Sequence, residues 1–294
     1  MKNTIKTILA GATLSLLLAG CEKEAEMPAG DRSIRIATGI QSPTKATDLD
    51  FEEGDNFGLF VVAWNGDAAP SLDDPRYLNN ASCIKTAGGI ELTKVYYPEG
   101  KSDFYAYYPY QSTFDAGTVL KHSVLADQSQ GRNYTKSDLM AACRPGVTES
   151  ETPVRLTFKH QLARIDIHLL PGTGFASADG LSGATVVAKS LKTSCSFDLS
   201  DNSVSDAGTP ADMTPKGNGA TVNGGTVSTM SLVAVPQTLA AGQLLFEITL
   251  GDKTFSYTPT EAVTLEQGKI CRFDITLNKQ VSAVSKAVIS SLSM

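Results

Sequence analysis

The stretch FKHQLARIDIHL, residues 158–169, carries the hydrophobic pattern that decides the fold. Its apolar residues keep one parity as far as Leu162 and take the other parity from Ala163 onward. Because successive side chains of a β-strand point to opposite faces, this change of phase predicts a bulge, or one short strand that runs into another. His160 shares the apolar parity, which favours a hydrogen-bonded core histidine over a catalytic base.

Charged side chains of the same stretch fall on the other face. Arg164, Asp166 and His168 alternate there, as expected of a solvated strand with opposite charges two residues apart. His122 is the remaining histidine, and the chain has neither a Gly-x-Ser-x-Gly elbow nor a His-Glu-x-x-His helix that would position a nucleophile or a metal. We therefore expect no catalytic residues, no metal site and no cofactor, and we expect that the protein is not an enzyme.

The period of two recurs along the chain and predicts an all-β fold. CRFDITL (271–277) alternates cleanly, and LLFEITL (244–250) with TFSYTP (254–259) predicts a hairpin around the turn between them. Residues 57–64 are apolar on both parities, which indicates a strand covered on both faces. The polar, glycine-rich stretch at 200–229 is typical of an exposed loop with a hairpin.

Two clusters could suggest a ligand. In DLDFEEGD (48–55) the position where a calcium-binding turn needs glycine is Glu53, so we interpret the segment as a solvated acidic loop. The aromatic segment YYPEGKSDFYAYYPY (96–110) alternates in a way that favours core packing and cross-strand pairs over a sugar-stacking platform.

The first 20 residues have the features of a secretory signal peptide. Two lysines precede an apolar run that is too short to span a membrane. The run ends at Leu18-Ala19-Gly20-Cys21, which resembles the box at which bacterial lipoproteins are cut and lipidated on cysteine. We expect lipid on Cys21 to hold the protein to the outer membrane, exposed at the cell surface, because several acyl chains anchor firmly.

The net charge of the chain argues against one class of function, the binding of nucleic acid. The chain has 31 acidic and 25 basic side chains, a formal charge of -6, and loss of the two lysines in residues 1–20 moves it to about -8. An acidic chain without a run of Lys or Arg gives no electrostatic footprint for nucleic acid.

Cys195 and Cys271 share the parity of apolar residues, so both are expected in a core. Together with Cys83 and Cys143 they could be thiols or disulfides, and the pairing stays open.

Six segments, in an order and spacing that cover nearly all of the chain after residue 41, resemble one family. They are SPTKATDLDFEEGDNFGLF (42–60), YYPEGKSDFYAYYPY (96–110), SDLMAA (137–142), LTFKHQLARIDIHL (156–169), VPQTLAAG (235–242) and LEQGKICRFDITL (265–277). Together they resemble the fimbrillins, the subunits of type V pili of Gram-negative anaerobes.

The resemblance implies two tandem β-sandwich domains of transthyretin-like topology after a lipoprotein signal peptide. It also implies a stalk or tip subunit that acts in adhesion, with other pilus subunits and a host or bacterial surface receptor as partners. The alternative is a non-polymerising surface lipoprotein that binds glycan or a host protein. The expected segments are a signal peptide (1–20), an acidic linker (21–31), two sandwiches (32–156 and 157–280) and a tail (281–294).

In this family a protease cuts after a basic residue, the first strand leaves, and a strand of the next subunit takes its place. SIRIATGI (33–40) is the candidate first strand, and Lys45 is the best placed cut site, since Arg32 and Arg35 lie before or inside the strand. Many relatives carry arginine where this chain has Lys45. The strand could instead stay, which would suit an anchor or a tip.

The resemblance places the donor strand in the tail, with Val284, Val288 and Leu292 as its candidate residues. Extended and helical patterns fit this segment about equally, so either a donor strand or a partly disordered terminus is expected.

Overall fold

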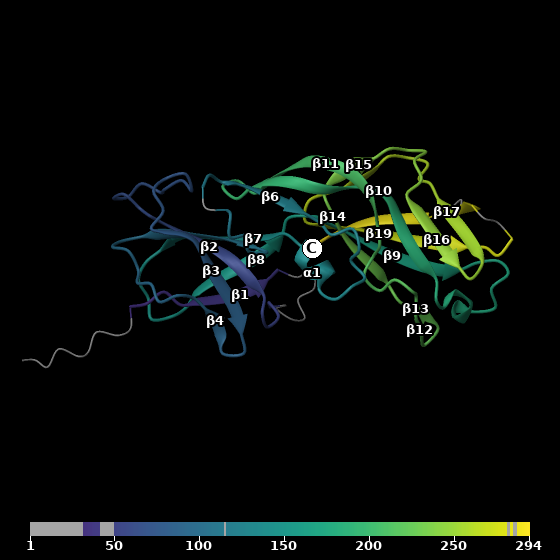
Figure 1. The fold of residues 1–294 in the computed structure, drawn as a ribbon, viewed down its shortest axis with the longest axis horizontal. Helices are drawn as coiled ribbons and strands as arrows, with labels where there is room; N and C mark the ends of the chain where they lie inside the picture. The colour runs from purple at the N-terminus through teal and green to yellow at the C-terminus, as the bar shows by residue number, and fades with distance from the viewer. Residues whose placement is uncertain (1–31, 42–49, 115, 281–282, 285–286) are drawn as a thin grey trace, which may run out of the picture. The chain divides into compact units, whose positions relative to one another are not determined.

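The computed structural model confirms the all-β prediction (Figure 1). The structure describes residues 32–41, 50–114, 116–280, 283–284 and 287–294. The helical segments in these ranges are short, α1 (Asn133–Ser137) and the 3₁₀ helix η1 (Ala178–Leu181), and neither is long and apolar enough to cross a membrane. The signal peptide, Cys21 and Lys45 lie outside the described residues.

The first sheet has seven strands in the order β1-β8-β7-β5-β2-β3-β4. Only β1 and β8 pair in parallel; the other neighbours are antiparallel. The strands are β1 (Ile36–Ile40), β2 (Asn56–Ala63), β3 (Leu78–Thr86), β4 (Gly89–Glu91), β5 (Ser102–Tyr108), β7 (Met140–Val147) and β8 (Val154–His160).

The remaining sheets come mainly from the second half of the chain. A six-stranded sheet runs β11-β10-β16-β17-β20, with β6 also paired to β10, and a four-stranded sheet runs β14-β9-β19-β21. Two small sheets pair β12 with β13 and β15 with β18. The strands are β6 (Val119–Ser123), β9 (Ala163–Pro171), β10 (Thr185–Asp198), β11 (Ser203–Met213), β12 (Val222–Asn223), β13 (Thr226–Val227), β14 (Met230–Ala234), β15 (Gln237–Leu239), β16 (Phe246–Leu250), β17 (Lys253–Tyr257), β18 (Val263–Leu265), β19 (Lys269–Leu277), β20 (Ala283–Val284) and β21 (Ala287–Ser293).

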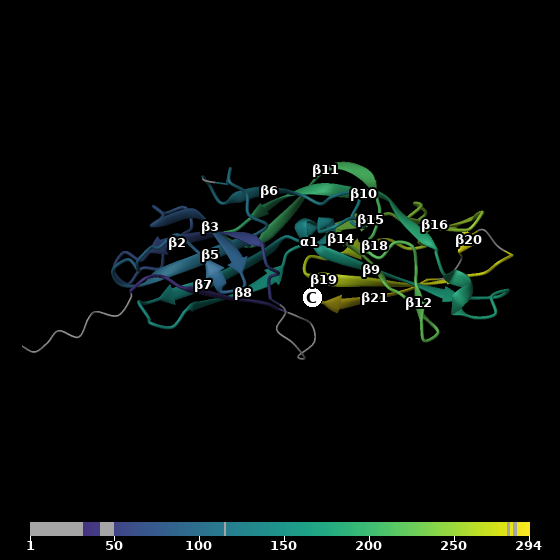
Figure 2. The same cartoon turned by 60° about the horizontal axis from the view of Figure 1, so that its bottom comes forward.

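The change of hydrophobic phase at Leu162–Ala163 is the point where the chain changes sheets. β8 ends at His160 in the seven-stranded sheet, and β9 begins at Ala163 in the four-stranded sheet (Figure 2). Leu162 and Ala163 are both fully buried, because the interior lies on opposite faces of the two consecutive strands. The prediction of one short strand running into another is confirmed.

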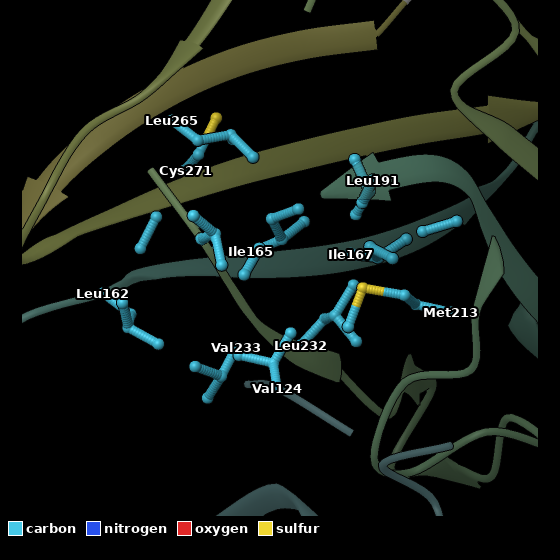
Figure 3. Packing of buried hydrophobic residues seen from close by; sticks show 14 of the residues in the cluster. Val124, Leu162, Ile165, Ile167, Leu191, Met213, Leu232, Val233, Leu265 and Cys271 are labelled. Atoms are coloured by element: carbon cyan, nitrogen blue, oxygen red, sulfur yellow. The ribbon is translucent and has the colours of Figure 1, made fainter. Parts of the chain in front are cut away.

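Buried apolar side chains form two clusters. The smaller belongs to one face of the seven-stranded sheet and contains Phe57, Phe104 and Phe158. The larger includes Phe60 and Tyr107 on the other face of the seven-stranded sheet and continues between the sheets of the second half. There Ile165 and Ile167 of β9 gather with Leu191 of β10 (Figure 3). The aromatic segment at 96–110 supplies core on both faces of β5, as predicted.

Several local predictions are confirmed and others are corrected. The hairpin of β16 and β17 pairs Phe246 with Tyr257 and Ile248 with Phe255, as the alternation predicted. The stretch at 200–229 is not only loop and hairpin. Ser203–Met213 forms a strand along β10, because the ladder supplies its hydrogen bonds although it carries few large apolar side chains. The tail is extended rather than helical in its described residues.

Candidate functional site

Strand β1 occupies an edge of the seven-stranded sheet, where β8 is its only partner among the described strands. Hydrogen bonds extend the contact beyond both ends of the strand: Val154 N–H donates to the Arg35 carbonyl and Gln41 N–H donates to the Phe158 carbonyl, each at 2.8 Å. Since no other strand of the sheet depends on β1, its departure would leave the remaining ladder intact and would expose one edge of β8.

The inward side chains of β1 and its approach are apolar. Ile34 and Ile36 are only 5% and 8% exposed and belong to the smaller cluster, and Ile40 packs against it. Burial of such a side chain contributes about 2 kcal/mol. Thr38 adds a hydrogen bond from its hydroxyl to Asp50 Oδ1 at 2.5 Å. The edge strand is thus held by backbone pairing with β8 and by alternate side chains that point into the smaller cluster.

The basic residues that could mark processing differ in their surroundings. Arg32 is exposed and forms an ion pair with Glu149. Arg35 is exposed as a side chain, but its carbonyl accepts a hydrogen bond from Val154, so its backbone is part of the sheet. Lys45 lies in the connection between β1 and β2, outside the described residues.

The two C-terminal strands also occupy edges. β20 pairs in parallel with β17, where Val284 faces Tyr257 in the register, and β21 pairs antiparallel with β19. Val288 and Leu292 are each 56% exposed, although both are apolar and both lie in a strand. The register sets Val288, Ser290 and Leu292 opposite Asp274, Arg272 and Ile270, so these three side chains share one face of the sheet.

The opposite edge of the four-stranded sheet is closed. The Gln128 side chain donates to the Val233 carbonyl at 2.8 Å and accepts from the Val233 N–H at 2.9 Å. Lys216 and Ser231 exchange two further backbone hydrogen bonds, at 2.8 and 3.0 Å. Because these contacts use the outward backbone groups of β14, β21 is the open edge of this sheet among the described residues.

A cavity of about 900 Å³ lies where β1 ends. Its lining includes Ile40 and Gln41 at the end of β1, His160 and Arg164 on the two sides of the sheet change, and Leu292 of β21. The C-terminal ends of β1 and β21 therefore border the same cavity.

His160 is hydrogen-bonded, as predicted, but only partly buried. Its Nδ1 lies 2.8 Å from Asp138 Oδ2, and 19% of the side chain is exposed. Burial alone would lower the pKa of His160, but the hydrogen bond and the charge of Asp138 outweigh burial and raise that pKa. The pair holds the start of β7 against the end of β8, which is a structural role.

Two charged residues are more buried than the sequence predicted. Asp166 is only 8% exposed; it receives two hydrogen bonds from Arg164, each at 2.8 Å, and one from Ser231 at 2.7 Å. Asp55, in the acidic loop, is also 8% exposed and accepts from Tyr108 Oη at 2.8 Å. The prediction of a fully solvated strand face and a fully solvated loop is wrong at these two positions, because partners distant in sequence cover them.

The cysteines are free thiols in the described residues. Cys83, Cys195 and Cys271 are buried, as predicted for the last two, and Cys143 is exposed. Burial raises the pKa of Cys83 to about 12 and the pKa values of Cys195 and Cys271 to about 11, which keeps these thiols protonated and unreactive. No group of three or more His, Cys, Asp or Glu side chains in the described part of the chain is placed to hold a metal ion.

The sequence pointed to β1 and to the C-terminal tail, but it gave no sign of which sheet edges are closed and which are open. The closing role of Gln128 has no sequence signal, since a glutamine in a loop gives no indication of a strand 105 residues away. The exposure of Val288 and Leu292 also depends on the register with β19.

The sheets and their edges define an all-β protein with an edge strand near each end of its described region. The chain belongs to the fimbrillin-like family, whose model matches residues 44–291. A curated relative from Bacteroides uniformis, named "Putative fimbrium subunit Fim1C", is 28% identical over 203 residues, which cover 66% of this chain and 65% of the relative. The match thus spans slightly less than two thirds of that relative's length.

Solved structures share the fold. A "putative cell adhesion protein" from Bacteroides uniformis has a TM-score of 0.61 at 21% identity, with 88% of this chain and 97% of that chain covered. Another protein of the same description, from Bacteroides ovatus, has a TM-score of 0.62 at 18% identity, with coverage of 89% and 96%. At these identities the likeness establishes the fold.

Proposed function

We propose that this chain is a structural subunit of a type V fimbria, in the stalk or at the tip, that is assembled by strand exchange and acts in adhesion. Membership of the fimbrillin-like family and the names of its relatives support this. The observation that carries the proposal is the position of β1: an edge strand with buried isoleucines that, among the described strands, pairs only with β8. It follows the proposed lipid anchor and precedes Lys45.

In the proposed pathway the precursor is exported as a lipoprotein, lipidated on Cys21 and held at the surface of the outer membrane. A protease then cuts after Lys45, in the connection between β1 and β2. This cut separates β1 from the rest of the subunit, whereas a cut at Arg32 or Arg35 would leave residues 36–40 covalently attached in their slot.

Departure of β1 exposes the apolar side chains beneath it and the backbone groups of β8. An incoming strand restores both, since main-chain hydrogen bonds supply affinity and alternating side chains supply specificity. The exposed apolar residues Val288 and Leu292 on an open edge are the proposed source of that strand in the neighbouring subunit.

The two proposed domains are 32–156 and 157–280. Their boundary falls inside β8 (Val154–His160), a few residues before the change of sheet that follows His160. The antiparallel pairing of β6 with β10 joins the two regions through one ladder. No catalytic step is proposed for either.

The test uses purified chain without the signal peptide, incubated with and without trypsin and run on a denaturing gel without boiling. A ladder of oligomers should appear after cleavage of the original chain and of an Arg35→Ala variant, but not of a Lys45→Ala variant. A monomer that persists after cleavage at Lys45 would rule out the polymerising subunit and favour a surface lipoprotein that binds glycan or a host protein. Loss of lipid labelling in a Cys21→Ser variant, expressed in full length in the membrane, tests the anchor separately.

A further inference from the structure

The β1 slot is the position beside β8 (Val154–His160) that β1 occupies, and the side chains that fill it follow a specific pattern. The parallel register pairs Ile36 with Val154, Thr38 with Leu156 and Ile40 with Phe158, all on the face that covers the smaller cluster. Ile34 precedes them and is buried in the same cluster, although its N–H donates to the Val95 carbonyl and not to β8. In chain order these positions hold two apolar residues, one hydroxyl residue and one apolar residue.

Strand β21 and the residue after it carry the same pattern in the reverse order. Val288, Ser290, Leu292 and Met294 share one parity, with an apolar residue, a hydroxyl residue and two apolar residues in succession. Val288 and Leu292 are exposed in their own sheet, so their transfer to another slot gives up little buried surface on that face.

From this match we infer that the tail of a second copy of this chain enters the β1 slot antiparallel to β8, the reverse of the direction in which β1 runs. The inference rests on the strand exchange proposed above and fixes its direction and register. Met294, Leu292, Ser290 and Val288 then take the places of Ile34, Ile36, Thr38 and Ile40.

The opposite direction fits less well. If Val288 took the place of Ile36 in a parallel strand, Leu292 would reach the place of Ile40, but Lys286 would take the place of Ile34. Ile34 is only 5% exposed, and an ammonium group there would lose its hydration without a built partner. The antiparallel direction puts Met294 there instead, and methionine adapts well to apolar gaps.

The reversed direction also gives the exchange a driving force. Parallel pairing is slightly less stable per residue than antiparallel pairing, and β1 is the parallel member of its sheet. Ser290 reaches the place of Thr38, from which a hydroxyl can donate to Asp50 as Thr38 does. Ile289 comes to the place of Gly39, where a Cβ lies 2.9 Å from the end of the flexible Arg155 side chain, so Arg155 has to shift.

Introduced cysteine pairs can distinguish the antiparallel from the parallel direction of the inserted strand. In the antiparallel register Ser291 lies opposite Arg155, whereas in the parallel register it lies opposite Thr157. Directly opposed residues have Cα atoms about 4.5–5.5 Å apart, within reach of a disulfide, and a shift of two residues moves them to about 7–8 Å. Arg155 and Thr157 are both exposed, so neither substitution leaves a cavity in the core.

The experiment compares R155C/S291C with T157C/S291C, both in a Cys143→Ser background that removes the exposed thiol, after cleavage at Lys45 and mild oxidation. The expected result is that R155C/S291C oligomers resist boiling without reductant and collapse with it, while T157C/S291C oligomers do not resist boiling. The reverse result, or oligomers that neither pair cross-links, overturns the inference but leaves strand exchange standing. The absence of oligomers in every variant overturns strand exchange as well.

A second readout does not depend on disulfides. Met294→Lys puts an ammonium in the slot of Ile34 in the antiparallel register, and should slow assembly of cleaved subunits by at least about tenfold, which corresponds to about 1.4 kcal/mol. Lys286→Met is the matched control and should leave assembly unchanged. If Lys286→Met accelerates assembly and Met294→Lys does not slow it, the strand enters in the parallel direction.

Discussion

Gln128 closes the edge of β14 by pairing its side-chain amide with both backbone groups of Val233, at 2.8 and 2.9 Å. The side chain acts in place of a neighbouring strand, and it is buried at 1% exposure. Within the part of the chain that the structure describes, this sheet therefore has one closed edge and one open edge, and the open edge is β21.

Replacement of Gln128 by alanine should lower the free energy of unfolding by about 2 kcal/mol, because it leaves two buried backbone groups of Val233 without partners. Gln128→Glu is the sharper variant, since the carboxylate can accept from the N–H but cannot donate to the carbonyl, and it should also be destabilised. Denaturant unfolding measures both. An alanine variant as stable as the original chain would show that water replaces the amide at this edge.

The Tyr97 hydroxyl is buried and has no hydrogen-bond partner among the described residues. Tyr97→Phe removes this group without changing the packing, so the variant should be as stable as the original chain or up to about 1 kcal/mol more stable. The matched control is Tyr107→Phe, because the Tyr107 hydroxyl lies 2.8 Å from Asn80 Oδ1 and 3.0 Å from the Gln111 carbonyl. That control should lose about 1–2 kcal/mol in the same unfolding measurement. Equal losses in the two variants would contradict the assignment.

His160 should make stability depend on pH. Burial lowers its pKa, but the hydrogen bond and charge of Asp138 outweigh this and raise the pKa above the ordinary value, even though the charge of Arg164 also lowers it. A raised pKa contributes stability below the unfolded-state pKa of about 6.5, and that contribution is lost as the pH rises through the folded-state value.

The measurement for His160 is the difference in unfolding free energy between the original chain and His160→Gln across pH 5.5–8.5. The difference should be largest at the acid end and should shrink toward the alkaline end. His122 is present in both proteins and cancels; burial lowers its pKa, so its own contribution has the opposite sign. A difference that grows with pH would mean that the His160–Asp138 pair does not stabilise the charged imidazole.

Val288 and Leu292 should be needed for assembly, whereas they should contribute little to the stability of the monomer. Both are 56% exposed, so a Val288→Ser, Leu292→Ser double variant should unfold within about 0.5 kcal/mol of the original chain. After cleavage, however, it should form no ladder, because its strand can no longer fill apolar slots. The control variant Val119→Ser, Leu170→Ser changes residues that are 49% and 43% exposed elsewhere, and it should still assemble. Loss of the ladder in both variants would indicate a general effect of surface polarity.

Much of the fold follows from local patterns. The alternation of CRFDITL, the hairpin around Gly251 and the change of phase at Leu162–Ala163 all appear in the structure as expected. Ser203–Met213 escaped prediction because an edge strand needs few large apolar side chains when its neighbour supplies the ladder. The tail was ambiguous for a related reason: its extended form comes from pairing with β19 rather than from a period of its own.

By itself, the sequence determined that this protein is all-β and where its chain changes face, because the period of two is a local property of the backbone. The tertiary structure alone decided which edges are open, which carboxylates are buried, and which side chains of the tail face solvent. Those properties depend on partners far apart along the chain, such as Gln128 with Val233 and Tyr108 with Asp55, and a hydrogen bond between distant residues leaves no pattern in the sequence around either one.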